Sequence, residues 1–294
     1  MSPSKVWFSA TAGLGRALTE LVLAKGDTAV ATARGVSAID DLKAQYPSDR
    51  LLVIKMDVTK PQEVADAFAE VKRTVGRLDV VFNSAASGAF GEVETVRDED
   101  ARAEIEVNFW GAWYVSRESV KFFREVNAPG VGGRLLQVSS MTGVIGSPGL
   151  GFYCASKFAL EGLSEALAAE LDPAWNIKVT LVEPDAYRTP GRRKVVWSPP
   201  HPSYSKSDLP ASQLRAIWDS VNPTGDPAKA AKAFYEIASL ADPPVHAPVG
   251  REQSRLSGKK RQISQPPSTS TSIYRRTWNS MNETLSYCVV RSYY

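Results

Sequence analysis

Short apolar runs alternate with longer segments of helical periodicity along the first 250 residues, and this alternation limits the fold more than any other feature of the chain. A strand, a helix and a second strand in succession form a β-α-β unit, whose right-handed crossover makes the two strands parallel. Repeated units of this kind bury a sheet between two layers of helices. The sequence therefore predicts an α/β fold, a doubly wound parallel sheet in a single domain.

The strand-like runs are continuously apolar, as in Leu51–Ile54, which is typical of strands buried on both faces. The expected strands are Val6–Phe8, Thr28–Thr32, Leu51–Lys55, Val80–Asn83, Arg134–Val138, Lys178–Val182 and a last one at Val245–Gly250. The expected helices are Arg16–Ala24, Gln62–Val75, Glu99–Asn127, Phe152–Leu171 and Pro227–Leu240.

The composition changes near Gly250. The net charge is +3 over 294 residues, but Arg251 to Tyr294 holds eight Lys or Arg and only two Glu, among many Ser and Thr. Such a segment lacks the apolar residues that a core needs. We expect one folded domain over residues 1–250 and a basic, Ser-rich, disordered tail over residues 251–294. Contact of the tail with RNA, an anionic membrane or a protein partner is the alternative.

Charge, hydropathy and cysteine content exclude several classes of protein. The first 250 residues carry a net negative charge, which argues against nucleic-acid binding. No apolar run reaches the about 18 residues that span a bilayer, and the polar start lacks a signal-peptide pattern, so we expect a cytoplasmic protein that binds no membrane. Cys154 and Cys288 are the only cysteines, too few for a disulfide framework or a paired metal site, and no metal is expected.

A glycine-containing turn follows the first expected strand. The segment Ser9–Arg16 contains Gly13, Leu14 and Gly15 and leads directly into a helix. Glycines at such a turn let backbone N–H groups and the helix dipole approach a pyrophosphate. An ordinary turn is the alternative, because two glycines alone are weak evidence.

Arg34 directly follows the second expected strand, with no acidic residue beside it. A carboxylate at this point would hold the ribose hydroxyl of NAD, whereas a cation would pair with the additional phosphate of NADP. Arg34 therefore favours NADP(H), with a solvent-facing arginine as the alternative.

Short polar residues also end the third and fourth strands, as Asp57-Val58 and Asn83-Ser84. Each alone is more typical of a helix cap or a turn. Together they lie at strand ends, where ligands bind in parallel sheets.

The segment Gln137–Lys157 carries the strongest chemical signal. Tyr153 and Lys157 are four residues apart at the start of a helical pattern, so that both side chains project from one face. A nearby ammonium should lower the pKa of the phenol and make it a usable general acid or base. Ser140 ends the fifth strand and could hold the reacting oxygen beside Tyr153. An exposed Tyr and Lys on a helix surface is the alternative.

In combination these features resemble the short-chain dehydrogenases/reductases, in their short, single-domain branch, from Lys5 to Gly250. The resemblance rests on order and spacing. The residues that carry it are the glycine turn, Asp57, Asn83-Ser84-Ala85-Ala86, Asn108 in Val107–Gly111, Ser139-Ser140, Tyr153-Cys154-Ala155-Ser156-Lys157 and Val182-Glu183-Pro184.

The resemblance implies a Rossmann-type fold, a catalytic role for four residues and a set of contacts to NADP(H). Tyr153 would donate or accept the proton, Lys157 would lower its pKa and hold the nicotinamide ribose, and Ser140 would orient the substrate carbonyl. Asn108 would support a water-linked proton relay. The cofactor contacts would be Gly13, Leu14 and Gly15 at the pyrophosphate, Asp57 and Val58 at the adenine, Asn83 at the adenosine ribose, and Pro184, Ala186 and Thr189 around the nicotinamide, with Arg34, Tyr153 and Lys157.

The chain departs from the family pattern at the glycine turn. The usual T-G-x-x-x-G-x-G is two residues longer, and Ser9 or Ala10 stands where its first glycine belongs. If that position needs a positive φ, a Cβ there would add strain of about 1 kcal/mol or more. Asp185 replaces the glycine that usually follows Pro184, and the tail replaces a C-terminal helix. These departures motivate an alternative function, a cofactor-impaired relative that acts as a binding or regulatory protein.

The main functional prediction is an NADPH-dependent oxidoreductase that acts on a ketone or a secondary alcohol, in specialised metabolism. Residues 190–226 correspond to the family's substrate flap, and their aromatic residues suggest an apolar, cyclic ligand. Aromatic residues that pack in the core would look the same. An epimerase or dehydratase is a third, weaker option. The family also suggests a homo-oligomer formed by the helices that carry Asn108 and Tyr153.

Overall fold

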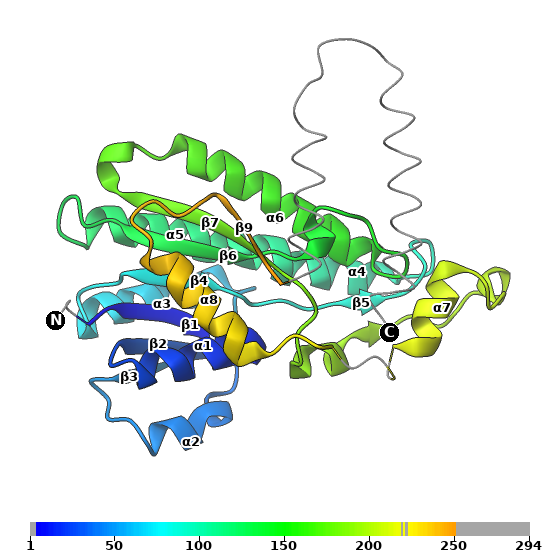
Figure 1. Cartoon of the computed structure of the whole chain (residues 1–294), viewed down its shortest axis with the longest axis horizontal. Coiled ribbons are helices and arrows are strands. Elements are labelled where there is room, and N and C mark those ends of the chain that lie inside the picture. The colour runs from blue at the N-terminus through cyan, green and yellow to red at the C-terminus, as the bar shows by residue number, and fades with distance from the viewer. Residues whose placement is uncertain (1–3, 219, 221–222, 251–294) are drawn as a thin grey trace, which may run out of the picture.

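Seven parallel strands form one sheet in the order β3-β2-β1-β4-β6-β7-β9 (Figure 1). The computed structural model describes residues 4–218, 220 and 223–250, so the expected tail over residues 251–294 lies outside the described residues. The strands are β1 Val6–Ala10, β2 Thr28–Ala33, β3 Leu51–Lys55, β4 Val80–Asn83, β6 Gly133–Val138, β7 Ile177–Pro184 and β9 His246–Val249. The predicted doubly wound parallel sheet in a single domain is confirmed.

Helices cover both faces of this sheet (Figure 1). The helices α1 Gly13–Ala24, α2 Asp40–Lys43 and α8 Pro227–Ser239 pack on one face. The helices α3 Pro61–Thr74, α5 Ala112–Glu125 and α6 Gly151–Glu170 pack on the other. Along β1, Trp7 belongs to the first core, whereas Val6 and Phe8 belong to the second. Burial on both faces explains why the strands are continuously apolar.

The single helix expected over Glu99–Asn127 is interrupted. It consists of α4 Asp98–Ile105, a π-helical turn over Glu106–Gly111 and α5. At Gly111 the side chain of Val58 comes so close that a Cβ would lie 2.7 Å from Val58 Cγ2. Apolar periodicity cannot distinguish an unbroken helix from one with a widened turn, and such turns are frequent at functional sites.

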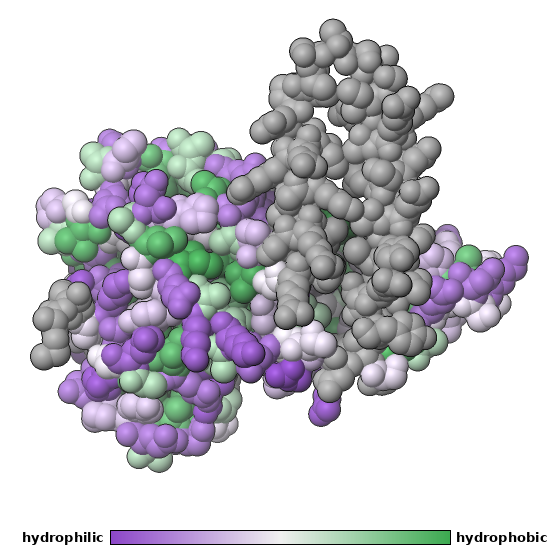
Figure 2. Space-filling model, in the orientation of Figure 1, coloured by the Kyte–Doolittle hydropathy of each residue, from purple (hydrophilic) through white to green (hydrophobic). Residues whose placement is uncertain are grey.

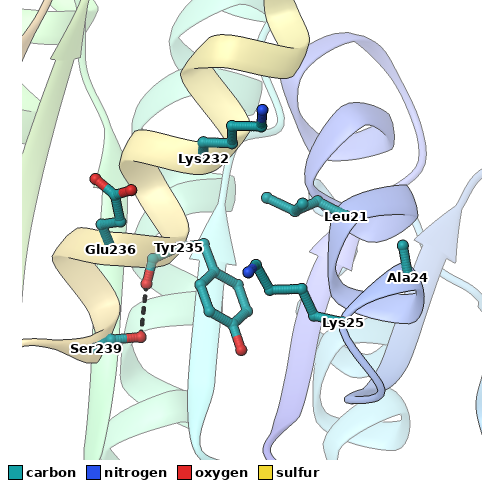
Figure 3. A pocket seen from close by; sticks show the side chains of 7 residues that line it. All are labelled: Leu21, Ala24, Lys25, Lys232, Tyr235, Glu236 and Ser239. Carbon is teal, nitrogen blue, oxygen red and sulfur yellow. Dashed lines mark hydrogen bonds between the residues drawn. The ribbon is translucent and has the colours of Figure 1, made fainter.

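Tyr235 fixes α8 against α1 and β1. Its ring stacks on Trp7 with 5.0 Å between centroids, and its hydroxyl donates a hydrogen bond to Asp27 Oδ2 at 2.7 Å. Figure 3 shows the groove between α1 and α8, where Lys25 lies beside this ring and Lys232 lies farther along α8. On the face seen in Figure 2, hydrophobic residues form a band among largely hydrophilic ones. The groove between α1 and α8 is lined by residues of these two helices, and none of the expected catalytic residues is among them.

The expected flap folds onto the loop that follows β4. Its strand β8 Val196–Trp197 pairs with β5 Ala89–Phe90, and its helix α7 Pro210–Ile217 lies beyond them, at the right of Figure 1. Arg215 of α7 contacts the buried Glu92 at 3.3 Å. The ring centroid of Phe90 lies 4.6 Å from that of Trp197 and 5.4 Å from that of Trp218. The flap aromatics therefore pack on one another, although Trp197 remains 40% exposed.

His246 joins the start of β9 to β7 and α6. Its Nδ1 lies 2.8 Å from Glu183 Oε1 and 3.4 Å from Glu161 Oε2, and both carboxylates are buried. Hydrogen bonds to Glu161 and Glu183 raise the pKa of His246 to about 10, although burial opposes this shift. The three side chains could surround a metal ion, but a metal would have to displace the proton that His246 shares with the two carboxylates.

We predict that this ion cluster stabilises the fold only while His246 is charged. The folded pKa of about 10 exceeds the unfolded value of 6.5, so the stabilisation is complete below pH 6.5 and is lost as the pH rises toward 10. The difference in unfolding free energy between the wild type and His246→Gln should therefore shrink over this pH interval in urea denaturation. His201→Gln, at an exposed histidine of the flap, is the control. A difference that stays constant with pH would contradict the assignment.

Candidate active site

The carboxyl ends of the central strands bring the predicted catalytic residues together. In a parallel sheet these ends share one edge, and here the strand order reverses between β1 and β4. Ligands bind outside such a reversal. Ser140 follows β6, while Tyr153 and Lys157 lie in the first two turns of α6.

Ser140, Tyr153 and Lys157 form one connected group. The hydroxyl of Ser140 is hydrogen-bonded to the phenol of Tyr153 and also accepts from the Thr142 backbone N–H at 3.2 Å. The ammonium of the buried Lys157 donates to the carbonyl of Val138 at 2.8 Å and lies 5.7 Å from the centroid of the Tyr153 ring. The Tyr153 side chain is partly exposed, so a substrate could reach it.

The expected lowering of the tyrosine pKa is wrong for this structure. Burial raises the pKa of Tyr153 to about 12, the charge of Glu104 adds to this, and the hydrogen bond with Ser140 opposes it. Burial also lowers the pKa of Lys157 to about 8. The physical reason is that the ammonium is directed to the Val138 carbonyl and does not contact the phenol oxygen, so that desolvation dominates.

Asn108 connects the loop after β4 to the catalytic helix. It is fully buried within the π-helical turn, accepts a hydrogen bond from the Ser87 N–H at 2.8 Å and donates to the Ser87 carbonyl at 3.0 Å. It also donates to Ser156 Oγ at 3.0 Å, which in turn donates to the carbonyl of Tyr153 at 2.7 Å. The sequence assigned no role to Ser87 or Ser156. The signal that could have revealed Ser156 is its polar side chain on the buried face of an apolar helix, one turn after Tyr153.

The glycine turn is short, and the residue in it that adopts a left-handed conformation is a glycine, Gly13. Strand β1 continues to Ala10, and α1 already begins at Gly13, whose φ is +54°. A Cβ at Gly15 would collide with the carbonyl oxygen of Ala10. The strain considered at Ser9 or Ala10 is absent, because Asn176 is the only non-glycine residue with a positive φ in the described part of the chain. Ser9 instead lies in β1 and donates to the Gly15 carbonyl at 3.2 Å.

The loop after β7 returns to this turn. Pro184 ends β7 and is buried, whereas Ala186 is exposed. The side chain of Thr189 lies 3.4 Å from the point that a Gly13 Cβ would occupy. Of the three expected cofactor contacts in this loop, Thr189 is thus placed at the start of α1. Leu14, expected at the pyrophosphate, is partly buried against the core.

The residues expected on the adenosine side of the cofactor include the charged Arg34 and Asp57 and the amide of Asn83. Arg34 is exposed after β2, and its charge acts on Asp57 after β3. Although burial opposes it, hydrogen bonds from Thr59 and the charge of Arg34 lower the pKa of Asp57. Asn83 donates to the carbonyl of Ala112 at 2.9 Å and to Gln137 at 2.8 Å, so its amide group holds α5 and β6 to β4.

The sequence profile of the short chain dehydrogenases matches residues 7–198, which include nearly all of the sheet and the four predicted catalytic residues. The chain belongs to this family. No helix in the described ranges is long and apolar enough to cross a membrane.

The chain is also similar to individual members. It is 38% identical over 253 residues to an uncharacterized oxidoreductase of Schizosaccharomyces pombe, covering 85% of this chain and 82% of that protein. It is 30% identical to a 3-ketodihydrosphingosine reductase of Bacteroides thetaiotaomicron, covering 82% of this chain and 85% of the relative. A solved short-chain dehydrogenase from Streptomyces avermitilis is 34% identical, with a TM-score of 0.78 over 90% of this chain and 94% of its own.

Two buried serines of α6 provide a matched test of the Asn108 connection. Ser156→Ala removes the acceptor of the Asn108 amide and should lower the unfolding free energy by about 1–3 kcal/mol, because a buried donor loses its partner. Ser164→Ala should have little effect, because its hydroxyl has no hydrogen-bond partner among the described residues. Urea denaturation measures both. Equal losses of stability in the two variants would show that the Ser156 contact is unimportant.

Proposed function

We propose that the chain is an NADPH-dependent oxidoreductase that transfers a hydride between the nicotinamide and a ketone or secondary alcohol. The observation that carries the proposal is the group formed by Ser140, Tyr153 and Lys157 at the end of β6. Two hydroxyls that are hydrogen-bonded to each other can both bind one substrate oxygen. The nearby ammonium favours the phenolate that remains when Tyr153 gives up its proton.

The residues present fit a dinucleotide. Gly13 and Gly15 let the chain turn tightly into α1, because a Cβ at Gly15 would collide with the Ala10 carbonyl and one at Gly13 would contact Thr189. The backbone N–H groups at this helix start could then contact a pyrophosphate. Arg34 would pair with the additional phosphate of NADP, which is the reason for preferring NADPH. Asp57, Val58 and Asn83 would lie on the adenosine side, and Pro184, Ala186 and Thr189 on the nicotinamide side. The bound cofactor would supply the hydride.

The protein residues would bind the substrate oxygen and move the proton. Tyr153 would donate its proton to this oxygen in reduction and take it back in oxidation. Ser140 would fix the same oxygen through its hydroxyl. Lys157 would hold the nicotinamide ribose, and its buried ammonium would stabilise the phenolate. Asn108 would keep α6 in place relative to the loop after β4 and, by family resemblance, support a water-linked proton relay.

A cofactor-impaired binding or regulatory protein is the second candidate. The observation that favours it is the short connection between β1 and α1, together with the approach of Thr189 to Gly13. Both reduce the room beside the pyrophosphate. The glycine positions and the complete catalytic set favour the enzyme instead.

A carbonyl substrate is supported by the similarity of the chain to the 3-ketodihydrosphingosine reductase. The flap aromatics pack on Phe90, as the core-packing alternative expects, and the exposed part of Trp197 is what supports an apolar ligand. Specialised metabolism and a cytoplasmic location stay predictions. For a homo-oligomer, support comes from Trp110 of the π-helical turn and Phe158 of α6, which are 42% and 45% exposed.

Tyr153→Phe should reduce turnover about a hundredfold or more, because it removes the transferable proton and little else. The assay follows NADPH consumption with a panel of aliphatic and cyclic ketones. Tyr46→Phe, which removes a hydroxyl near α2, is the control and should retain full activity. A loss of less than tenfold in Tyr153→Phe would contradict the assigned role.

A further inference from the structure

Glu104 is a buried carboxyl group that the proposed reaction does not use. It lies on α4, one helical turn before Asn108, and is 2% exposed. Neither carboxyl oxygen has a hydrogen-bond partner among the described residues that meets ordinary geometry. Burying a carboxyl group without a hydrogen-bond partner disfavours folding, whether the group is charged or neutral. A group this unfavourable for folding suggests a functional reason for its presence.

The carboxyl group of Glu104 lies beside the catalytic tyrosine. A Cβ built on Gly88 would be 3.8 Å from Glu104 Oε1, 3.9 Å from Tyr153 Cδ2 and 3.6 Å from Val195 of the flap. Glu104 and the Tyr153 ring therefore adjoin the same small space between the catalytic helix and the flap.

The charged and titratable groups that face Glu104 come from α6. They are Tyr153, Cys154 and Lys157, each of which responds to its charge. The strand β5, which also packs on α4, brings only Ala89 and Phe90. Glu161, one turn after Lys157, acts on the same ammonium.

Glu104 and Tyr153 affect each other's ionisation. Burial raises the pKa of Glu104 to about 7, although the Ala89 backbone and Lys157 favour the charged form. The ionised carboxylate, in turn, disfavours a second negative charge and adds to the raised pKa of Tyr153.

We propose that Glu104 is a positioning residue that keeps the Tyr153 phenol protonated and so prepares the site for carbonyl reduction. The proposal rests on the proposed function. In reduction the carbonyl carbon gains a hydride from the dihydronicotinamide, the O–H bond of Tyr153 breaks and its proton goes to the substrate oxygen. The carbonyl is reduced and the dihydronicotinamide is oxidised. The tyrosine regains a proton from solvent.

The test is the pH dependence of alcohol oxidation, because oxidation needs the phenolate. With NADP and a secondary alcohol that the wild type oxidises, the rise of kcat with pH should occur about one pH unit lower in Glu104→Gln. The two profiles should converge at low pH, where the wild-type carboxyl is neutral as well. Glu104→Met, of similar length and apolar, should give the same shift and serves if the glutamine variant does not fold.

Glu99→Gln is the matched control, because it removes the same charge from the exposed end of α4. Its profile should coincide with that of the wild type. An unchanged profile in both Glu104 variants would overturn the proposal while leaving the proposed function intact. Absence of oxidation and reduction in the wild type would overturn both.

Infrared absorption gives a readout that does not depend on turnover. At pH 6 the wild type should show the carbonyl band of a protonated, desolvated carboxylic acid, because the pKa of Glu104 is about 7. The band should be absent in Glu104→Gln and present in Glu99→Gln. A band that persists unchanged up to pH 10 would show a Glu104 that stays neutral and cannot act on Tyr153, and would overturn the proposal.

Discussion

Parallel pairing of the strands is the constraint on which the rest of this structure depends. Because the strands of the main sheet run in one direction, their carboxyl ends share an edge, and residues far apart in the sequence meet there. Ser140 and Tyr153 meet the loop after β4 through this geometry. The same edge places Arg34 near Asp57. An antiparallel arrangement would distribute these residues between two edges.

Burial then determines how the groups at this edge ionise. Lys157 is held by a backbone carbonyl in the interior, and its pKa is lowered to about 8. Tyr153 and Glu104 are desolvated in the same region, so both prefer their neutral forms. Near neutral pH the phenol of Tyr153 is therefore protonated and can act as a proton donor. This state suits the protonation of an oxygen on which negative charge develops.

The sequence predicted the sheet, and the structure brings the predicted catalytic residues together at one end of it, because both depend on local patterns. Apolar runs located all seven strands to within a few residues, and Tyr153, Lys157 and Ser140 occur in a recognisable order. The π-helical turn at Asn108 was not predictable, since apolar periodicity does not distinguish it from an unbroken helix. The contribution of Glu104 and the raised pKa of Tyr153 were also missed. Both arise from contacts between α4 and α6, which no local pattern encodes.

The short turn between β1 and α1 is where the family's architecture is most altered. Its left-handed residue is Gly13, and Ser9 has become part of the strand. The start of α1 thus keeps bare backbone, although Thr189 lies close to it. Whether the enzyme account holds depends on this point, because the catalytic group has no hydride without a dinucleotide.

Titration of the wild-type chain with NADPH and with NADH, followed by nicotinamide fluorescence, measures whether the altered turn holds a dinucleotide. We expect saturable binding of NADPH at one site per chain, and weaker binding of NADH because Arg34 has no phosphate to pair with. Tighter binding of NADH would contradict the role of Arg34. Binding of neither nucleotide would contradict the enzyme account and favour a non-catalytic protein.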